Sequence, residues 1–286
     1  MKKFKIITAV IILVAMVAGM VYWQSRSKWD GRRDYRLAMI SQDGLGLIAI
    51  SPTRRMVNTV RIDGKTRVWV PGGMGWYEAA KIEKIFLQEK NYRLVEEIFF
   101  YNFGFWPDEF EFGALDRWQS RSILGRQLGW LGYLKYKLME PNLIFKDEDV
   151  AGENSNLASE LLDEVAPRDL ADSQILGGNL KFRLYNTSQQ KGLAAFLGRR
   201  MEWAGYFVMS VENFDEKSNN CQVVVNSKTK ENGDLGKIIS WWECAVKPDE
   251  GLPDDEVEVY WGEAVGEMLK YSSYDNILEP DKIENN

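Results

Sequence analysis

Four basic side chains and one carboxylate are the residues whose types and spacing point to chemistry. Arg61, Lys65 and Arg67 lie close together in the sequence, and Arg126 follows further along the chain. Guanidinium and ammonium groups collected in one place bind phosphates, and Asp43 offers a carboxylate for magnesium. The competing interpretation is that the basic side chains are solvated around a hairpin and that Asp43 serves a turn with the glycine that follows it.

Histidine is absent from the chain, and the only cysteines are Cys221 and Cys244. The absence of histidine removes the commonest general base and the commonest neutral metal ligand. The two cysteines form no C-x-x-C motif, which excludes a thiolate metal site. They either form a disulfide in an oxidising compartment or are buried as small apolar side chains. We expect no cofactor, and magnesium belongs only to the phosphate-binding interpretation.

A glycine-rich segment at residues 72–77 ends in two aromatic residues, Trp76 and Tyr77. A flexible loop of this kind can present aromatic rings to a glycan. The alternative is that the loop folds back and packs both rings onto the domain.

Residues 6–23 form an uncharged stretch of 18 residues near the N-terminus. A helix of this length is roughly 27 Å long, about the thickness of the hydrocarbon core of a bilayer. The stretch has no small-residue cleavage site, and Tyr22 and Trp23 stand where interfacial aromatic residues belong. We therefore expect a retained, single-pass signal anchor in the cell membrane, with residues 1–5 as a cytoplasmic tail and the body of the protein outside the cytoplasm.

The charge balance restricts the partners of the body. The chain has 36 basic and 42 acidic residues, for a net charge of −6. Nucleic-acid-binding domains carry a basic face, so this balance and the anchor together argue against a nucleic-acid partner and a transcription regulator. We expect partners at the membrane and among wall glycans or envelope proteins.

The first predicted domain spans residues 35–140 and follows a charged stalk at residues 24–34. Apolar runs predict four strands, with a hairpin turn at Asp63-Gly64; the strands are expected at 36–40, 45–50, 56–62 and 66–70. Helical periodicity follows at 79–86 and 94–101. The aromatic and basic stretch at 113–139 is long enough for a helix that either covers the sheet or lies on a membrane surface, and we favour covering.

The remainder of the chain divides into an acidic linker, a second domain and a tail. We expect residues 141–177 to be the linker, with one short helix after Ser155, and residues 266–286 to be a flexible tail. Residues 178–265 read as a small domain of order β-α-β-β-α-β. The predicted fold class is therefore α/β (α+β): a membrane helix, a mixed sheet with covering helices, and this second domain.

The second domain resembles the LytR C-terminal domain over about residues 178–265. The marks are Asn186-Thr187-Ser188 after a strand, Gly192-Leu193-Ala194 at a helix start, and a final strand that runs into Gly262. The family often has Gly-Thr where this chain has Thr187-Ser188. The resemblance implies no catalytic residue in this domain.

The first domain is similar to the LytR/CpsA/Psr domain, on the matching stretch between residues 47 and 72. The resemblance implies an enzyme that transfers glycopolymers from a polyprenyl-pyrophosphate carrier to the cell wall. In the family an Arg-Asp pair stands where this chain has Gly64 and Lys65, and the family arginine grips the pyrophosphate. Asp43 corresponds to the family's acid near magnesium, and Arg126 to an arginine of its late helix.

The sequence therefore predicts a membrane-anchored, extracytoplasmic envelope protein. We expect a non-catalytic module that binds or scaffolds wall glycan or partner proteins, since Gly64 cannot replace the family arginine. The alternative is an active LytR/CpsA/Psr-type phosphotransferase that uses the basic residues and magnesium.

Overall fold

The computed structural model describes residues 14, 18, 19, 29–113, 121–150 and 159–269. The predicted mixture of strands and helices is confirmed: two five-stranded sheets and one two-stranded sheet are accompanied by helices. The predicted membrane helix at 6–23 lies outside the described residues, apart from three isolated positions. Across the described residues, no helix combines the length and apolar character needed to cross a bilayer.

The first sheet has the strand order β6-β1-β2-β3-β7. Its strands are β1 (Tyr35–Ser41), β2 (Gly44–Ser51), β3 (Met56–Asp63), β6 (Glu109–Phe112) and β7 (Ile144–Val150). Every residue of β1 and β2 is buried, because this sheet is packed on both faces. That double burial explains why these strands read as continuous apolar runs rather than alternating ones.

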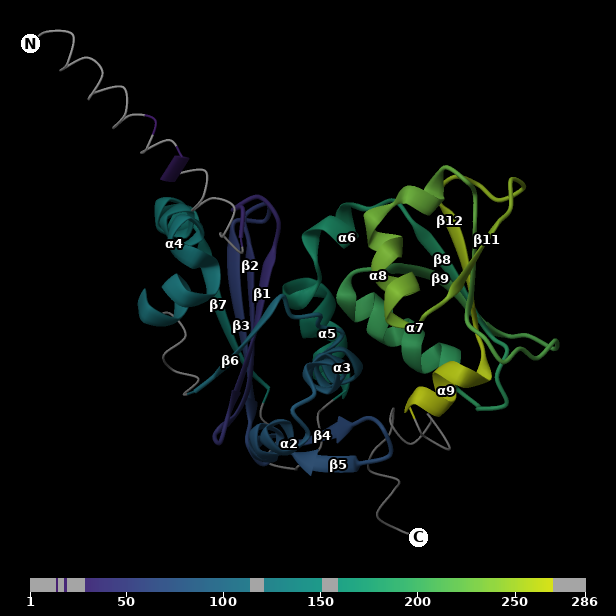
Figure 1. Cartoon of the computed structure of the whole chain (residues 1–286), viewed down its shortest axis with the longest axis horizontal. Helices are drawn as coiled ribbons and strands as arrows, with labels where there is room; N and C mark the ends of the chain where they lie inside the picture. Colours follow the sequence, from purple (N-terminus) through teal and green to yellow (C-terminus); the bar gives the residue numbers. More distant parts are fainter. Residues whose placement is uncertain (1–13, 15–17, 20–28, 114–120, 151–158, 270–286) are drawn as a thin grey trace, which may run out of the picture.

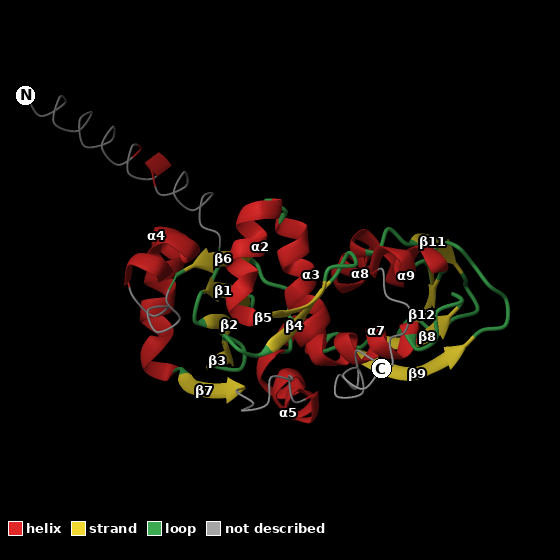
Figure 2. Ribbon diagram, turned by 90° about the horizontal axis from the view of Figure 1, so that it is seen from below, coloured by secondary structure: helices red, strands yellow, loops and turns green. Residues whose placement is uncertain are grey.

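Helices lie on both faces of the first sheet, as Figures 1 and 2 both show. On the outer face, α4 (Arg121–Met139, kinked at Gly129) packs Leu124, Leu128 and Tyr136 onto the sheet, which confirms that this stretch covers it. On the inner face lie α2 (Ile82–Glu89), α3 (Tyr92–Phe103) and α5 (Ser159–Val165).

The turn predicted at Asp63-Gly64 is present, but it does not close a hairpin. The Asp63 side chain accepts a hydrogen bond from the Lys65 backbone N–H at 2.8 Å, and the chain then leaves the sheet. Strand β4 (Arg67–Val70) pairs instead with β5 (Gly75–Glu78), a strand that the sequence did not predict. Local turn chemistry identified the turn and could not identify the partner strand.

The acidic segment at 141–177 contributes to the fold, which the prediction of a linker missed. It holds β7, α5, a π-helical turn (Ala166–Leu170) and α6 (Ser173–Gly177). Strand β7 pairs in parallel with β3 at the sheet edge through backbone hydrogen bonds, which do not depend on side-chain charge. Leu162, Val165 and Leu170 are buried in the core beneath the first sheet.

The second sheet has the order β11-β10-β12-β8-β9. Its strands are β8 (Lys181–Asn186), β9 (Phe207–Asn213), β10 (Gln222–Val225), β11 (Ala245–Pro248) and β12 (Glu256–Trp261). With α7 (Leu193–Ala204) and α8 (Gly233–Trp241), they reproduce the predicted β-α-β-β-α-β order, to which β11 and α9 (Glu263–Leu269) are added.

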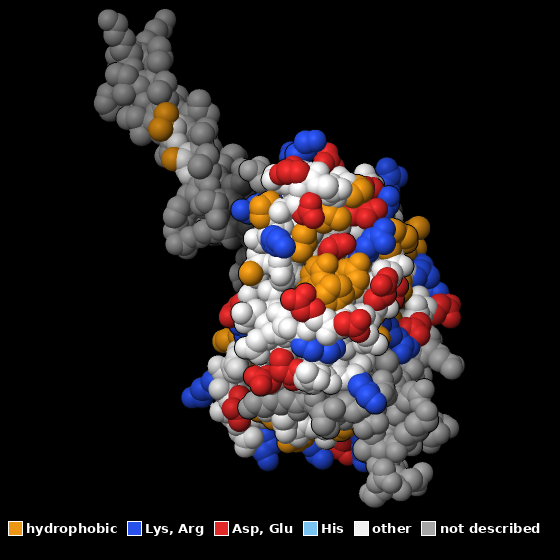
Figure 3. Space-filling model, turned by 90° about the vertical axis from the view of Figure 1, so that its right-hand side faces the viewer, with side chains coloured by type: hydrophobic (Ala, Val, Ile, Leu, Met, Phe, Trp, Pro, Cys, Tyr) orange, Lys and Arg blue, Asp and Glu red, His pale blue; other side chains and the backbone are white. Residues whose placement is uncertain are grey.

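The outer face of this second sheet is not covered by the described helices, which lie on its other side (Figure 1). Tyr185 and Tyr260, paired across β8 and β12, stack at 4.7 Å between ring centroids, and Phe214 meets both edge-on. Figure 3 shows apolar side chains in the middle of this face with acidic and basic ones around them. Because the two tyrosine rings stack on each other, each has one face covered within the cluster.

The two halves of the chain share a core rather than sitting apart. Trp69, Phe100 and Trp106 from the first half belong to the same buried cluster as the helices and strands of the second. Phe100 stacks on Trp106 at 4.3 Å, and Trp106 in turn contacts Trp242 edge-on at 6.1 Å. The Nε of the buried Arg200 on α7 donates to the Tyr101 carbonyl of α3 at 2.7 Å. The predicted boundaries at 140 and 178 therefore do not separate two independent cores.

Candidate functional site

The predicted phosphate-binding residues are placed on different parts of the first half. Arg61 lies on β3 and Arg67 on β4, which pairs outside the main sheet. Asp43 and Lys65 occupy touching turns at one end of the sheet: a Cβ on Gly64 would lie 3.0 Å from the Asp43 carbonyl oxygen. The Arg126 side chain lies outside what the structure describes. The structure thus brings Asp43 near Lys65, and Arg67 stands on a separate sheet.

The predicted glycan-contacting residues, Trp76 and Tyr77, lie on β5 and are partly buried. Trp76 packs against the core shared by the two halves, and Tyr77 packs against the core beneath the first sheet. Both rings therefore face protein over part of their surface rather than standing free on a loop.

Cys221 and Cys244 form a disulfide, which settles the alternative left open by the sequence. The bond joins the start of β10 to the end of the turn after α8, and the Cys221 carbonyl accepts from the Ala245 N–H at 3.0 Å. Residues on either side of the two cysteines are thereby held close together.

We expect the full-length protein to carry no free thiol when it is isolated and unfolded without reductant. Maleimide mass tagging should then add nothing, and two tags should be added after reduction. Two tags before reduction would contradict the disulfide.

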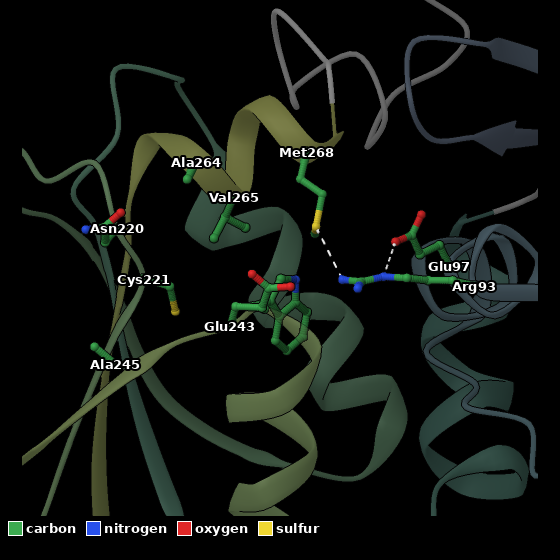
Figure 4. A pocket seen from close by; sticks show the side chains of 10 residues that line it. Arg93, Glu97, Asn220, Cys221, Glu243, Ala245, Ala264, Val265 and Met268 are labelled. Atoms are coloured by element: carbon green, nitrogen blue, oxygen red, sulfur yellow. Dashed lines mark hydrogen bonds and ion pairs between the residues drawn. The ribbon is translucent and has the colours of Figure 1, made fainter.

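A cleft of about 560 Å³ lies between this disulfide and helix α3 (Figure 4). Its apolar lining includes Trp242, Val265 and Met268. Its polar groups come from distant parts of the sequence: Arg93 and Glu97 on α3, Asn220 before β10, and Glu243 beside Cys244. Pockets that combine an apolar lining with a few polar groups are the usual form of small-ligand sites.

Arg93 is held at the mouth of the cleft by several contacts. Its Nε lies 3.2 Å from Glu97 Oε1, and a terminal nitrogen donates to the Trp241 carbonyl at 2.9 Å. Its guanidinium also lies 5.8 Å from the centre of a Trp241 ring. Burial raises the pKa of Glu97 above its ordinary value, and the hydrogen bond from Arg93 opposes that shift. The pair presents a fixed donor and a partly desolvated carboxyl group.

Glu243 adopts a left-handed backbone conformation, with φ of +53°. Such a conformation is uncommon for residues other than glycine and persists only where the surrounding structure enforces it. Here the enforcing elements are the disulfide at the next residue and the hydrogen bond from the Cys244 N–H to the Ile239 carbonyl at 3.0 Å. The strain places a carboxylate beside the cleft.

The cleft offers recognition chemistry: a cation, two carboxyl groups and an amide around an apolar lining. Among the described residues, no three acidic or cysteine side chains come together as a metal site requires.

Sequence reasoning missed this cleft because its residues are about 150 positions apart in the chain. Arg93 and Glu97 have the i, i+4 spacing of an ordinary surface ion pair, which carries no functional signal. The one usable clue was the cysteine pair, because a disulfide would have placed Asn220 and Glu243 side by side.

Comparison of the chain with family models, curated proteins and solved structures finds no match.

Proposed function

We propose that this chain is a membrane-anchored, extracytoplasmic envelope protein whose cleft binds wall glycan without catalysing a reaction. The observation that carries the proposal is the cleft beside Cys221–Cys244, with polar groups around an apolar lining. A sugar ring has C–H groups on its faces and hydroxyl groups at its edges, and these two surfaces match apolar and polar walls respectively.

Two further features support the cellular setting. Disulfides persist in oxidising compartments, so the bond between Cys221 and Cys244 favours a body outside the cytoplasm. The uncharged stretch at residues 6–23 has the length and composition of a membrane anchor.

The replacement Glu243→Gly separates a functional role of this residue from a structural one. Glycine relieves the left-handed backbone, so we expect the free energy of unfolding to rise by about 1 kcal/mol. Loss of the carboxylate should weaken binding of muramidase-solubilised wall fragments about tenfold, since a hydrogen bond to a charged group contributes roughly 1.5–3 kcal/mol. Calorimetry and urea unfolding of the full-length protein in detergent micelles measure both quantities.

Arg55→Gly is the matched control. Arg55 also has φ of +53° and is exposed, but it lies in the turn between β2 and β3, away from the cleft. We expect the same gain in stability and unchanged binding. Equal affinity in Glu243→Gly and the unaltered protein, or no binding by the unaltered protein, would contradict glycan recognition at this cleft.

The alternative function, a phosphotransferase, has less support. Arg61, Lys65, Arg67 and Asp43 are not among the residues that line the cleft. Turnover of a prenyl-pyrophosphate-linked sugar that Asp43→Ala abolishes would favour the enzyme over the binding module.

A further inference from the structure

We propose that the outward face of α4 rests on the bilayer surface, so that the body is docked on the membrane as well as tethered to it. This inference relies on the proposed anchor. It concerns a strip of two leucines, Leu134 and Leu138, which are 44% and 71% exposed. They are four residues apart, so they occupy one face of the helix.

The strip faces away from the sheet that α4 covers. Tyr136 is fully buried against that sheet, and Tyr133 and Met139 are partly buried there. In Figures 1 and 2, α4 is the outermost layer of the first half, on the side opposite the second sheet. Leu138 also lines a cavity of about 280 Å³, together with Pro52, Met139 and Leu143 and with the polar Arg55 and Asn142.

The chain enters the body directly on this helix. Trp29 is fully buried in the core under α4, and its indole Nε1 donates to the Arg33 carbonyl at 2.7 Å. Lys135 Nζ donates to the Asp30 carbonyl at 2.7 Å, and a Cβ on Gly31 would lie 3.0 Å from the Lys135 side chain. The point of entry is therefore held against Lys135, which stands between the two leucines in the sequence.

The tether is too short to hold this surface far from lipid. Only residues 24–28 separate the apolar stretch from Trp29. Five residues span at most about 18 Å when fully extended. The strip is thus held close to the bilayer, and two lysines, Lys135 and Lys137, flank it as is typical of helices that lie at a lipid surface. These arguments select lipid, rather than a soluble partner, as the occupant.

Site-specific quenching tests the contact. Because both native cysteines are in the disulfide, a new cysteine at Leu138 can be labelled selectively with an environment-sensitive fluorophore in the full-length protein. In nanodiscs with one protein each, we expect lipids carrying a nitroxide near the headgroup end of the acyl chain to quench this label about threefold more than a label at Leu87. Leu87 is the control because it is 61% exposed on α2, which covers the opposite face of the sheet.

In a second measurement, the two leucines of the strip are replaced while the fluorescent label is placed at a different residue. A label at Asn142, exposed just after α4, should also be quenched, and the double replacement Leu134→Gln with Leu138→Gln should lower its quenching to the Leu87 level. Equal quenching at Leu138 and Leu87 would overturn docking. Quenching that requires two copies per disc would overturn it in favour of self-association. Failure of the protein to enter nanodiscs would instead contradict the anchor.

Discussion

Replacing Asp172 with asparagine should lower the free energy of unfolding by about 3–5 kcal/mol, because it removes the carboxylate that forms an ion pair with a buried arginine. Arg36 on β1 is 2% exposed, and its Nη2 lies 3.7 Å from Asp172 Oδ2. Lys237 on α8 approaches the same oxygen at 3.4 Å. Asp172 thus joins the first sheet to the second half of the chain.

Asparagine has nearly the same shape as aspartate but no charge, so this replacement tests the effect of the charge alone. The Asp172 side chain also caps α6 by accepting from the Gln174 N–H, and asparagine caps helices equally well. The matched control is Asp255→Asn, which breaks the exposed Lys181–Asp255 pair and should change stability little. Urea unfolding of the full-length proteins in micelles measures both. Equal losses of unfolding free energy in the two variants would show that the buried Arg36–Asp172 pair stabilises the fold no more than an exposed ion pair does.

The same replacement should alter the dependence of stability on pH. Burial raises the pKa of Asp172, but Arg36, Lys237 and the hydrogen bond from the Gln174 N–H together lower it by more, so its pKa in the folded protein lies below the ordinary 3.8. A lowered folded pKa contributes stability above the unfolded value that is lost as pH falls through the folded value. The deficit of the asparagine variant should therefore shrink below about pH 4. Burial also raises the pKa of nearby Asp108, which therefore adds its own pH dependence to the stability of both proteins. The quantity to follow is thus the difference in unfolding free energy between the asparagine variant and the unaltered protein at each pH.

Replacing Gly104 with alanine should be nearly as damaging, with an expected loss of about 2–5 kcal/mol. Gly104 ends α3 with φ of +63°, and a Cβ there would lie 2.4 Å from Trp203 Cβ and 2.8 Å from the Arg200 carbonyl oxygen on α7. The added methyl group would force α3 away from α7 and open the shared core.

Gly72→Ala is the control for backbone strain alone. Gly72 has φ of +78°, and a Cβ there would have no atom within 4 Å. We expect a loss of only about 1–2 kcal/mol, the cost of the left-handed conformation. The excess loss in Gly104→Ala, measured by urea unfolding, reports the packing between the two halves. If the two losses were equal, the close approach of α3 and α7 would be refuted.

The sequence alone determined features that depend on neighbouring residues. Apolar runs located β1, β2 and β3, helical spacing located α2 and α3, and Asp63-Gly64 located a turn. The length and composition of residues 6–23 predict an anchor in the same way, although that segment lies outside the described residues. Each signal is local, because strand, helix and turn preferences act over a few positions.

Only the tertiary structure decided which elements meet. The partner of β4, the acidic strand β7 at the sheet edge and the pairing of Cys221 with Cys244 all depend on contacts between distant residues. The cleft exists because α3 packs against the second half and places Arg93 across from the disulfide. Such contacts arise from burial and shape in three dimensions, and a single sequence carries no periodic signal for them.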